Sequence, residues 1–336
     1  MEKLTQKTFQ TSRSLTYTYY DTASVKPGTS TPEKPTLVFL HGFPDSAFLW
    51  SSVLPHFSSL PNRIIVPDLL GYGGTSKPTD PSLYNSKDMA ADLKELLASE
   101  GVTKIVVIGH DWGSFLAARV WIWHPEIVVG AAFLNVPYMP PDTSKPFNLE
   151  DSLQMTEKAT GFPRFAYWEL FTADDGAKVS DAHLDRFWSA VHGDRENWMR
   201  DMFCVRGAFR NHLINGTDVG LKEYAKEGSK WEKEWMERMR KDRLEAPFCW
   251  YKAMADNHHY EVEKGISAEK LKVTVPAFYL GCTGDEVCLP QLIEMPRKAG
   301  LLPDLTVKVI DSGHWCTMEK PDEVGQNLLA FIKEKF

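Results

Sequence analysis

The segment Gly109-His110-Asp111-Trp112-Gly113 places an acidic side chain between two glycines, each two positions away. This spacing is typical of a nucleophile elbow, a tight strand-to-helix turn that leaves no room for side chains at the glycine positions. Serine usually stands at the tip of such a turn. An aspartate there is ionised at neutral pH, because its ordinary pKa is about 3.9 and a helix N-terminus favours the charged form. Taken alone, Asp111 also fits an ordinary helix N-cap.

A carboxylate nucleophile limits the bonds that this turn can break. Attack on an ester or amide carbonyl would form an anhydride and gain little, whereas attack on a saturated carbon forms an ordinary alkyl ester. The expected substrates therefore carry an electrophilic sp³ carbon, as in an epoxide or a carbon–halogen bond. A serine esterase is excluded, since Ser114 lies too far beyond the tip of the turn to replace Asp111.

In folds built around a nucleophile elbow, an acid and then a histidine follow the nucleophile along the chain, and two residues near the C-terminus fit these places. His314 stands in Gly313-His314-Trp315, directly after the last predicted strand, and Asp285 follows the strand before it. Glu286 is a competing acid candidate, although its side chain would point away from that of its neighbour. Each signal is weak alone, and together they favour a catalytic triad.

The loop His41-Gly42-Phe43-Pro44 follows another predicted strand and indicates an oxyanion hole. In folds built around a nucleophile elbow, the loop after this strand contributes one backbone N–H group to the oxyanion hole, which here is that of Phe43. The residue after the nucleophile, Trp112, contributes the second. Each donor is typically worth about 10²–10³ in rate.

Alternating apolar segments predict the elements that position these residues. Strands are expected at 15–20 (an edge strand), 36–40, 63–68, 104–108, 128–135, 273–280 and 305–310, and helices at 86–100, 114–121 and from 321 onward. Strands alternating with helices over this length imply a parallel sheet that is covered on both faces.

Residues 138–268 interrupt this alternation. After Pro137 the segments are mostly helical, and one of them, 231–240, is amphipathic. We therefore predict a helical cap at 138–268, inserted between the two parts of an α/β core at 1–137 and 269–336.

The composition excludes several classes of protein. The 336 residues are 43% hydrophobic with a net charge of -7, which argues against a nucleic-acid surface. No segment approaches the roughly 18 apolar residues of a membrane span, and the first residues lack the apolar stretch of a signal peptide. The cysteines have no zinc-like spacing, and Asn257-His258-His259 lacks a third ligand, so no metal site is expected. A cytoplasmic protein is the simplest interpretation.

With these motifs together, the chain resembles the α/β-hydrolase family and, within it, the soluble epoxide hydrolases. The resemblance covers nearly the whole chain, more loosely through the cap. It is carried by His41-Gly42-Phe43-Pro44, Gly71-Tyr72-Gly73, Gly109-His110-Asp111-Trp112-Gly113, Gly284-Asp285 and Gly313-His314-Trp315. The expected fold is an α/β-hydrolase fold, with a mostly parallel central sheet, helices on both faces and an inserted helical cap.

The resemblance also implies two catalytic tyrosines in the cap, above the nucleophile. Their best matches are Tyr251 and Tyr167, although Trp168 stands where relatives often carry glutamine. Without the resemblance, aromatic packing explains both tyrosines equally well. The substrate-binding residues implied in the same way are His41, Pro44, Trp168 and Trp315.

The leaving group separates the two candidate reactions. Epoxide opening releases an alkoxide that needs an acid, which tyrosine can supply, whereas halide release needs only N–H donors. Haloalkane dehalogenases usually carry asparagine where this chain has Phe43, and haloacid dehalogenases carry arginine where it has Trp112. Both departures favour the epoxide. A non-catalytic small-molecule receptor is the alternative of another class; it would tolerate loss of the triad, which is present here.

The sequence therefore predicts an epoxide hydrolase that converts a small apolar epoxide and water to a vicinal diol. The expected intermediate is an alkyl ester on Asp111, hydrolysed by water that His314 and Asp285 activate. No metal, organic cofactor, nucleic acid or membrane is expected to take part. Detoxification and biosynthesis are both compatible with these residues, and the oligomeric state is left open.

Overall fold

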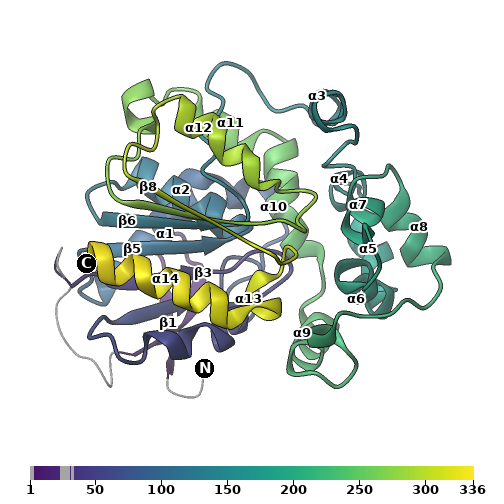
Figure 1. The fold of residues 1–336 in the computed structure, drawn as a ribbon, viewed down its shortest axis with the longest axis horizontal. Coiled ribbons are helices and arrows are strands. Elements are labelled where there is room, and N and C mark those ends of the chain that lie inside the picture. The colour runs from purple at the N-terminus through teal and green to yellow at the C-terminus, as the bar shows by residue number, and fades with distance from the viewer. Residues whose placement is uncertain (1–3, 23–30, 32–33) are drawn as a thin grey trace.

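The computed structural model, which describes residues 4–22, 31 and 34–336, contains one eight-stranded sheet (Figure 1). In chain order its strands are β1 (Thr5–Gln10), β2 (Thr16–Asp21), β3 (Thr36–Leu40), β4 (Ile64–Pro67), β5 (Ile105–His110), β6 (Val128–Leu134), β7 (Ala277–Cys282) and β8 (Leu305–Ile310). Their order in the sheet is β1-β2-β4-β3-β5-β6-β7-β8. β2 pairs antiparallel with both β1 and β4, and all other pairs are parallel. The mostly parallel sheet is confirmed.

The first strand corrects one prediction. Residues 15–20 were expected at the edge of the sheet, but β1 pairs alongside β2 and takes that position. The sequence of β1, Thr-Gln-Lys-Thr-Phe-Gln, has a single apolar residue, and none of its residues is buried. An exposed edge strand needs little apolar surface, so hydrophobic alternation gave no signal for it.

Helices cover both faces of the sheet, which explains why β3, β4 and β5 are buried at every residue. In Figure 1, α14 lies on the near face, whereas α1 and α2 lie behind the sheet. Outside the region between β6 and β7, the helices are α1 (Ser86–Ser99), α2 (Trp112–Trp123), α12 (Glu294–Lys298), α13 (Cys316–Glu319) and α14 (Pro321–Lys335). Short 3₁₀ helices occur at Ala47–Ser52, Leu54–Phe57, Pro81–Tyr84, Glu223–Ala225, Ala268–Leu271 and Pro290–Ile293. The helices predicted at 86–100, 114–121 and from 321 are confirmed.

Nine helices, and no strand of the sheet, occupy the described chain between β6 and β7. They are α3 (Leu149–Thr160), α4 (Trp168–Phe171), α5 (Gly176–Asp181), α6 (Leu184–His192), α7 (Trp198–Phe203), α8 (Ala208–Asn215), α9 (Lys230–Asp242), α10 (Glu245–Ala255) and α11 (His258–Glu263). Most of them stand to the right of the sheet in Figure 1, whereas α10 and α11 lie beside it. We refer to residues 138–268 as the insert. The domain limits at 137/138 and 268/269 stay predictions.

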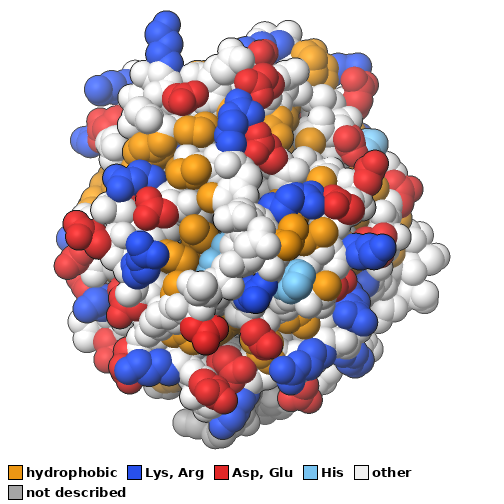
Figure 2. All heavy atoms as spheres, turned by 90° about the vertical axis from the view of Figure 1, so that its right-hand side faces the viewer, with side chains coloured by type: hydrophobic (Ala, Val, Ile, Leu, Met, Phe, Trp, Pro, Cys, Tyr) orange, Lys and Arg blue, Asp and Glu red, His pale blue; other side chains and the backbone are white. Residues whose placement is uncertain are grey.

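The outer face of the insert is shown in Figure 2. Acidic and basic side chains are interspersed there, with hydrophobic side chains between them. None of the helices in the described ranges combines the length and the hydropathy needed to cross a membrane.

Both ends of the insert are attached to α2 by one side chain. Arg119 Nε lies 2.7 Å from Glu263 Oε1 of α11, and its Nη1 donates a 2.5 Å hydrogen bond to the carbonyl of Met139. Ser86 Oγ of α1 donates a further hydrogen bond to the Glu263 carboxylate. Because Asp111 stands at the start of α2, the buried contacts of Arg119 connect the insert to the helix that begins at Asp111.

Candidate active site

Asp111 occupies the turn between β5 and α2 with φ 55° and ψ -124°, a backbone conformation that residues other than glycine rarely adopt. The glycines on either side permit this turn. A Cβ at Gly109 would lie 2.2 Å from the carbonyl oxygen of Gly113, and one at Gly113 would lie 2.2 Å from that of Leu40. The Asp111 side chain makes no helix-capping hydrogen bond, so the alternative of an ordinary N-cap is wrong.

The Phe43 loop approaches this carboxylate through its backbone. The Phe43 N–H donates a 2.8 Å hydrogen bond to Asp111 Oδ1. Gly42 is required beside it, because a Cβ there would lie 2.4 Å from the Asp111 Cβ. Trp112 is the first residue of α2, so its backbone N–H has no partner within the helix. Its part in an oxyanion hole stays a prediction.

His41 contacts backbone groups through both of its ring nitrogens, and one of these groups lies in the Phe43 loop. Its Nε2 accepts a 2.9 Å hydrogen bond from the Leu69 N–H, and its Nδ1 lies 2.9 Å from the Gly42 carbonyl oxygen. Burial lowers the pKa of His41 to about 3, so the ring is neutral. The side chain is 0% exposed, so this structure does not bring the predicted substrate-binding His41 to a surface that a substrate reaches.

His314 lies between two carboxylates. Its Nδ1 is 2.6 Å from Asp285 Oδ2, and its Nε2 is 3.4 Å from Asp111 Oδ2. Of the two acid candidates, Asp285 is the one whose carboxylate contacts His314, and it is fully buried, whereas Glu286 is partly exposed. Asp111, His314 and Asp285 therefore form one chain of contacts across the ends of β5, β8 and β7.

Charge determines the protonation of this chain. Burial acts to raise the Asp111 pKa, but the hydrogen bond and charge of His314 outweigh it and lower that pKa below its ordinary value. Burial acts to lower the His314 pKa, yet Asp285 and Asp111 together hold it well above its ordinary value. The resting site thus pairs an ionised Asp111 with a positively charged His314.

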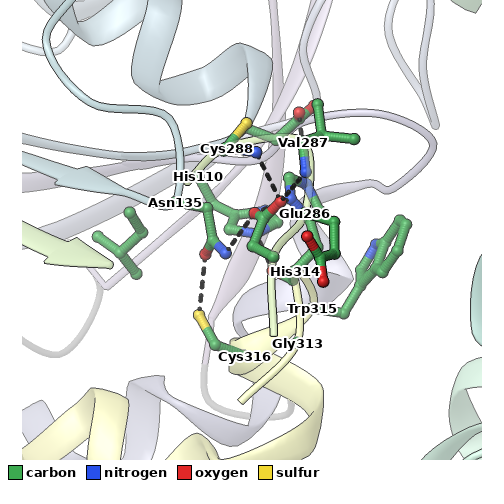
Figure 3. Close-up of polar contacts among 12 residues, drawn as sticks. His110, Asn135, Glu286, Val287, Cys288, Gly313, His314, Trp315 and Cys316 are labelled. Atoms are coloured by element: carbon green, nitrogen blue, oxygen red, sulfur yellow. Dashed lines mark hydrogen bonds and ion pairs between the residues drawn. The ribbon is translucent and has the colours of Figure 1, made fainter. Parts of the chain in front are cut away.

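Asn135 is a member of this site that the sequence did not reveal. Its Nδ2 donates a 2.9 Å hydrogen bond to Asp285 Oδ2, and its Oδ1 accepts one of 3.2 Å from Cys316 Sγ (Figure 3). The other oxygen of Asp285 accepts hydrogen bonds from the backbone N–H groups of Val287 and Cys288, of 3.1 and 2.7 Å. The available signal was the place of Asn135, a polar residue directly after a central parallel strand, where α/β proteins build their sites.

The two predicted cap tyrosines lie side by side. The rings of Tyr167 and Tyr251 are 5.9 Å apart between centroids, and Tyr251 also packs edge-on against Phe43 and Trp112 at 5.1 and 5.2 Å. Burial raises the pKa of both tyrosines well above 10. For Tyr167 the next largest cause is the Asp111 carboxylate. For Tyr251 it is the neighbouring Tyr167, followed by Asp111. Both hydroxyl groups are therefore protonated, and both lie in the field of the Asp111 carboxylate.

The other predicted substrate-binding residues differ in their surroundings. Trp168 packs against Tyr251 and Trp112, with ring centroids 5.1 and 5.8 Å apart. Trp315 donates a 3.2 Å hydrogen bond from Nε1 to Asp45, and the Pro44 carbonyl accepts one of 3.0 Å from Arg238. Trp168 thus belongs to the same aromatic cluster as Tyr251 and Trp112, and the substrate contacts of all three predicted residues stay predictions.

Comparisons with known proteins agree with this geometry. A family model described as alpha/beta hydrolase fold matches residues 35–321. The chain is 28% identical over 336 residues to epoxide hydrolase srdG of Neurospora crassa, covering 96% of this chain and 93% of that protein. It is 27% identical over 304 residues to bifunctional epoxide hydrolase 2 of Rattus norvegicus, covering 89% of this chain and 52% of that protein, about half of its length.

Among solved structures, epoxide hydrolase A from Mycobacterium thermoresistibile superimposes with a TM-score of 0.77. The match covers 98% of each chain at 22% sequence identity. At this identity the likeness is evidence for the fold, including the predicted α/β-hydrolase architecture.

Proposed function

This chain belongs to the α/β-hydrolase fold family and is an epoxide hydrolase, and we propose that it works through a covalent ester on Asp111. One observation carries the proposal. The Phe43 N–H contacts Oδ1 of the Asp111 carboxylate, and His314 faces Oδ2. A backbone hydrogen-bond donor and an imidazole ring therefore both contact the carboxylate that would attack.

In the first step, Asp111 Oδ2 attacks one ring carbon of the epoxide and the carbon–oxygen bond on that carbon breaks. Oδ2 is the attacking atom because Oδ1 is occupied by the Phe43 N–H. The departing oxygen takes a proton from Tyr167 or Tyr251, whose raised pKa values keep them protonated until the alkoxide forms. The phenolate regains its proton from solvent. A positioned acid typically contributes about 10²–10⁴-fold.

Ester formation prepares the second step. Once Asp111 is esterified its negative charge is gone, so the pKa of His314 falls and the ring releases its Nε2 proton to solvent. Neutral His314 then takes a proton from water at Nε2, while Asp285 holds Nδ1. The hydroxide attacks Cγ of Asp111, and the negative charge that develops on Oδ1 meets the Phe43 N–H and, as predicted, that of Trp112. In the collapse the bond between Cγ and the former Oδ2 breaks, and the departing alkoxide takes the proton back from His314 Nε2 and leaves as the diol. The Asp111 carboxyl group then gives its proton to His314, which restores the ionised pair.

The surroundings suit a small apolar epoxide. Tyr167, Tyr251, Trp168 and Trp112 form an aromatic layer next to the nucleophile, and water and epoxide are the two reactants. The scheme requires no metal or organic cofactor. The cytoplasmic location stays a prediction.

A panel of substrates tests the proposal. Wild-type protein is expected to form diol from an aryl epoxide, whereas Asp111→Asn, which has no anionic nucleophile, is expected to form none. Asp175→Asn is the matched control, because this exposed aspartate pairs with Arg210 on the insert. Bromide release from a bromoalkane without diol formation from any epoxide would instead identify a dehalogenase and contradict the proposal.

A further inference from the structure

Cys288 lies beside the Asp285–His314 pair. Among the residues that the structure describes, Asp285, Cys288 and His314 are the one group of three or more His, Cys, Asp or Glu side chains whose potential metal ligands all lie within 4.8 Å of one another. Cys288 retains some exposure to solvent, whereas the other four cysteines are buried: Cys204, Cys249, Cys282 and Cys316. The proposed reaction uses the backbone N–H of Cys288, which holds Asp285, and leaves the thiol without a part.

These three side chains form a chemically coherent donor set. Thiolate, imidazole and carboxylate are the ligands that Zn²⁺ and its softer relative Cd²⁺ prefer in proteins. Bonds of about 2.0–2.3 Å in a tetrahedral site place ligand atoms roughly 3.3–3.8 Å apart. The Nδ1–Oδ2 pair, now 2.6 Å apart, must therefore separate by about 1 Å, whereas ligand atoms up to 4.8 Å apart must approach by about 1 Å. Three protein ligands leave the fourth position for water.

We propose that a thiophilic divalent cation binds Cys288, His314 and Asp285 and inhibits the second step of the reaction. The cation bonds to Cys288 Sγ, and the thiol proton leaves to solvent. It also bonds to His314 Nδ1, where it replaces the proton now shared with Asp285 Oδ2, and that proton leaves to solvent as well. The charges of one thiolate and one carboxylate balance those of the cation.

The choice of nitrogen determines what is inhibited. With the cation on Nδ1, the ring proton of neutral His314 resides on Nε2, the atom that faces Asp111. That nitrogen can no longer accept a proton from water, so hydrolysis of the ester stops. The first step needs only Asp111 and the two tyrosines, and it continues. This consequence rests on the proposed function, whereas the binding of the cation does not.

Cys288 contributes no thiolate unless a cation is present. A thiol without a bound cation is mostly protonated at neutral pH, because its ordinary pKa is about 8.5. A soft cation forms a bond strong enough to displace that proton, whereas Mg²⁺ and Ca²⁺, which prefer oxygen ligands, do not. Inhibition should therefore follow the thiophilicity of the cation rather than its charge.

Binding is tested first, on enzyme without substrate. Cd²⁺ titrated into metal-free wild-type protein is expected to give a saturable ultraviolet thiolate-to-cadmium absorption band at one equivalent. Cys288→Ala and Cys288→Ser are expected to lose the band or to weaken binding by about tenfold or more. Cys249→Ala, which removes a buried thiol of α10 outside the cluster, is the matched control and keeps it. Wild-type protein without a band, or a Cys288→Ser variant that keeps wild-type affinity, overturns the proposal.

Inhibition is tested second, with Zn²⁺ and an epoxide, each variant being compared with its own metal-free rate. Zn²⁺-treated wild type is expected to accumulate the alkyl-enzyme, seen by intact-protein mass spectrometry, and Cys288→Ser is expected to keep turning over. Zn²⁺ that prevents the adduct from forming overturns the assignment to Nδ1. If Cd²⁺ binds through Cys288 but no epoxide ever forms an adduct in metal-free His314→Gln, the covalent mechanism fails and the cation site stands.

Discussion

The backbone N–H of Phe43 donates a 2.8 Å hydrogen bond to Asp111 Oδ1, although 68 residues separate the two in sequence. The same carboxylate turns Oδ2 toward His314, 3.4 Å away. Its two oxygens are therefore distinguished before any substrate binds. In the proposed mechanism, Oδ1 meets the donor that a tetrahedral oxyanion needs, and Oδ2 is left to attack carbon.

This distinction predicts the path of oxygen in a single turnover in ¹⁸O-labelled water. Because water attacks Cγ of the ester, the label is expected in the Asp111 carboxylate, and the first diol is expected to carry the original Oδ2. Mass spectrometry of the Asp111 peptide and of the diol measures both. Label in the first diol with none in Asp111 would mean that water attacks the epoxide directly.

Replacing His314 by glutamine is expected to stop the reaction at the ester. The variant retains Asp111 and both tyrosines, so the first step proceeds, while hydrolysis slows by about 10²–10⁴-fold without the base. Intact-protein mass spectrometry should show the protein heavier by the mass of one epoxide. The double variant Asp111→Asn/His314→Gln is the control and should show no adduct. A single variant that never reacts with the epoxide would contradict the two-step scheme.

Loss of either tyrosine hydroxyl is expected to affect only ring opening. Tyr251→Phe and Tyr167→Phe should each slow ester formation by about 10²-fold, because the leaving alkoxide then has one donor fewer. Stopped-flow tryptophan fluorescence measures this step, with Trp112 and Trp168 next to the tyrosines. Tyr19→Phe is the control, since that hydroxyl bonds Glu100, outside the site. If both tyrosine variants open the ring at the wild-type rate, aromatic packing is their only role.

The pKa of His314 is expected to follow the charge of Asp111. Burial acts to lower this pKa, and the negative charges of Asp285 and Asp111 stabilise the imidazolium and raise it. Asp111→Asn removes one of these charges, so the His314 pKa should fall, as it should in the alkyl-enzyme. NMR titration of the His314 ring measures the shift, with Asp175→Asn as a control that leaves it unchanged. An equal pKa in wild type and Asp111→Asn would show that the two residues are not coupled.

The same coupling gives kcat a pH dependence of definite sign. Hydrolysis needs neutral His314, so kcat should decrease as the pH falls through the His314 pKa of the alkyl-enzyme. Ester formation itself should depend little on pH in that range, because the lowered pKa of Asp111 keeps it ionised. Single-turnover measurements separate the two steps. A pH dependence confined to ester formation would contradict the assignment of His314 as the base.

The turn at Asp111 could be predicted from sequence because its determinants are local. Two glycines, a β-branched strand before and a helix after are enough to specify it, and the structure shows why each glycine is needed. Asn135 escaped prediction because its value lies in a contact with Asp285, 150 residues away. No local sequence pattern encodes this contact in space, which depends on how the ends of β6 and β7 align in the sheet.

Burial was the other quantity that the sequence did not reveal. His41 belongs to the motif whose Phe43 N–H contacts Asp111, and the family resemblance implied that it contacts substrate. In the structure both of its ring nitrogens engage backbone groups and the side chain has no exposed surface. The thiol of Cys288 is the opposite case, since its sequence context is unremarkable for catalysis and the packing of two loops brings it to His314.

The buried pair of Arg119 and Glu263 leads to a prediction about stability. Their side chains are each 4% exposed and 2.7 Å apart. Arg119→Met leaves the Glu263 carboxylate buried without its charged partner, which typically costs about 3–5 kcal/mol in the free energy of unfolding at neutral pH. Urea denaturation measures the loss. The double variant Arg119→Met/Glu263→Leu is the control and should recover much of it, since no buried charge remains.

The loss caused by Arg119→Met is expected to depend on pH, with a sign that identifies its origin. Burial acts to raise the Glu263 pKa, but the charge of Arg119 outweighs it and lowers that pKa below its ordinary value. A carboxyl group with a lowered pKa in the folded state stabilises the protein above its unfolded pKa, and this stabilisation is lost as the pH falls through the folded value. The difference between wild type and Arg119→Met should therefore be largest at neutral pH and shrink in acid. A loss that stays constant with pH would mean that Arg119 acts through its hydrogen bond to Met139 and its packing, and not through its charge.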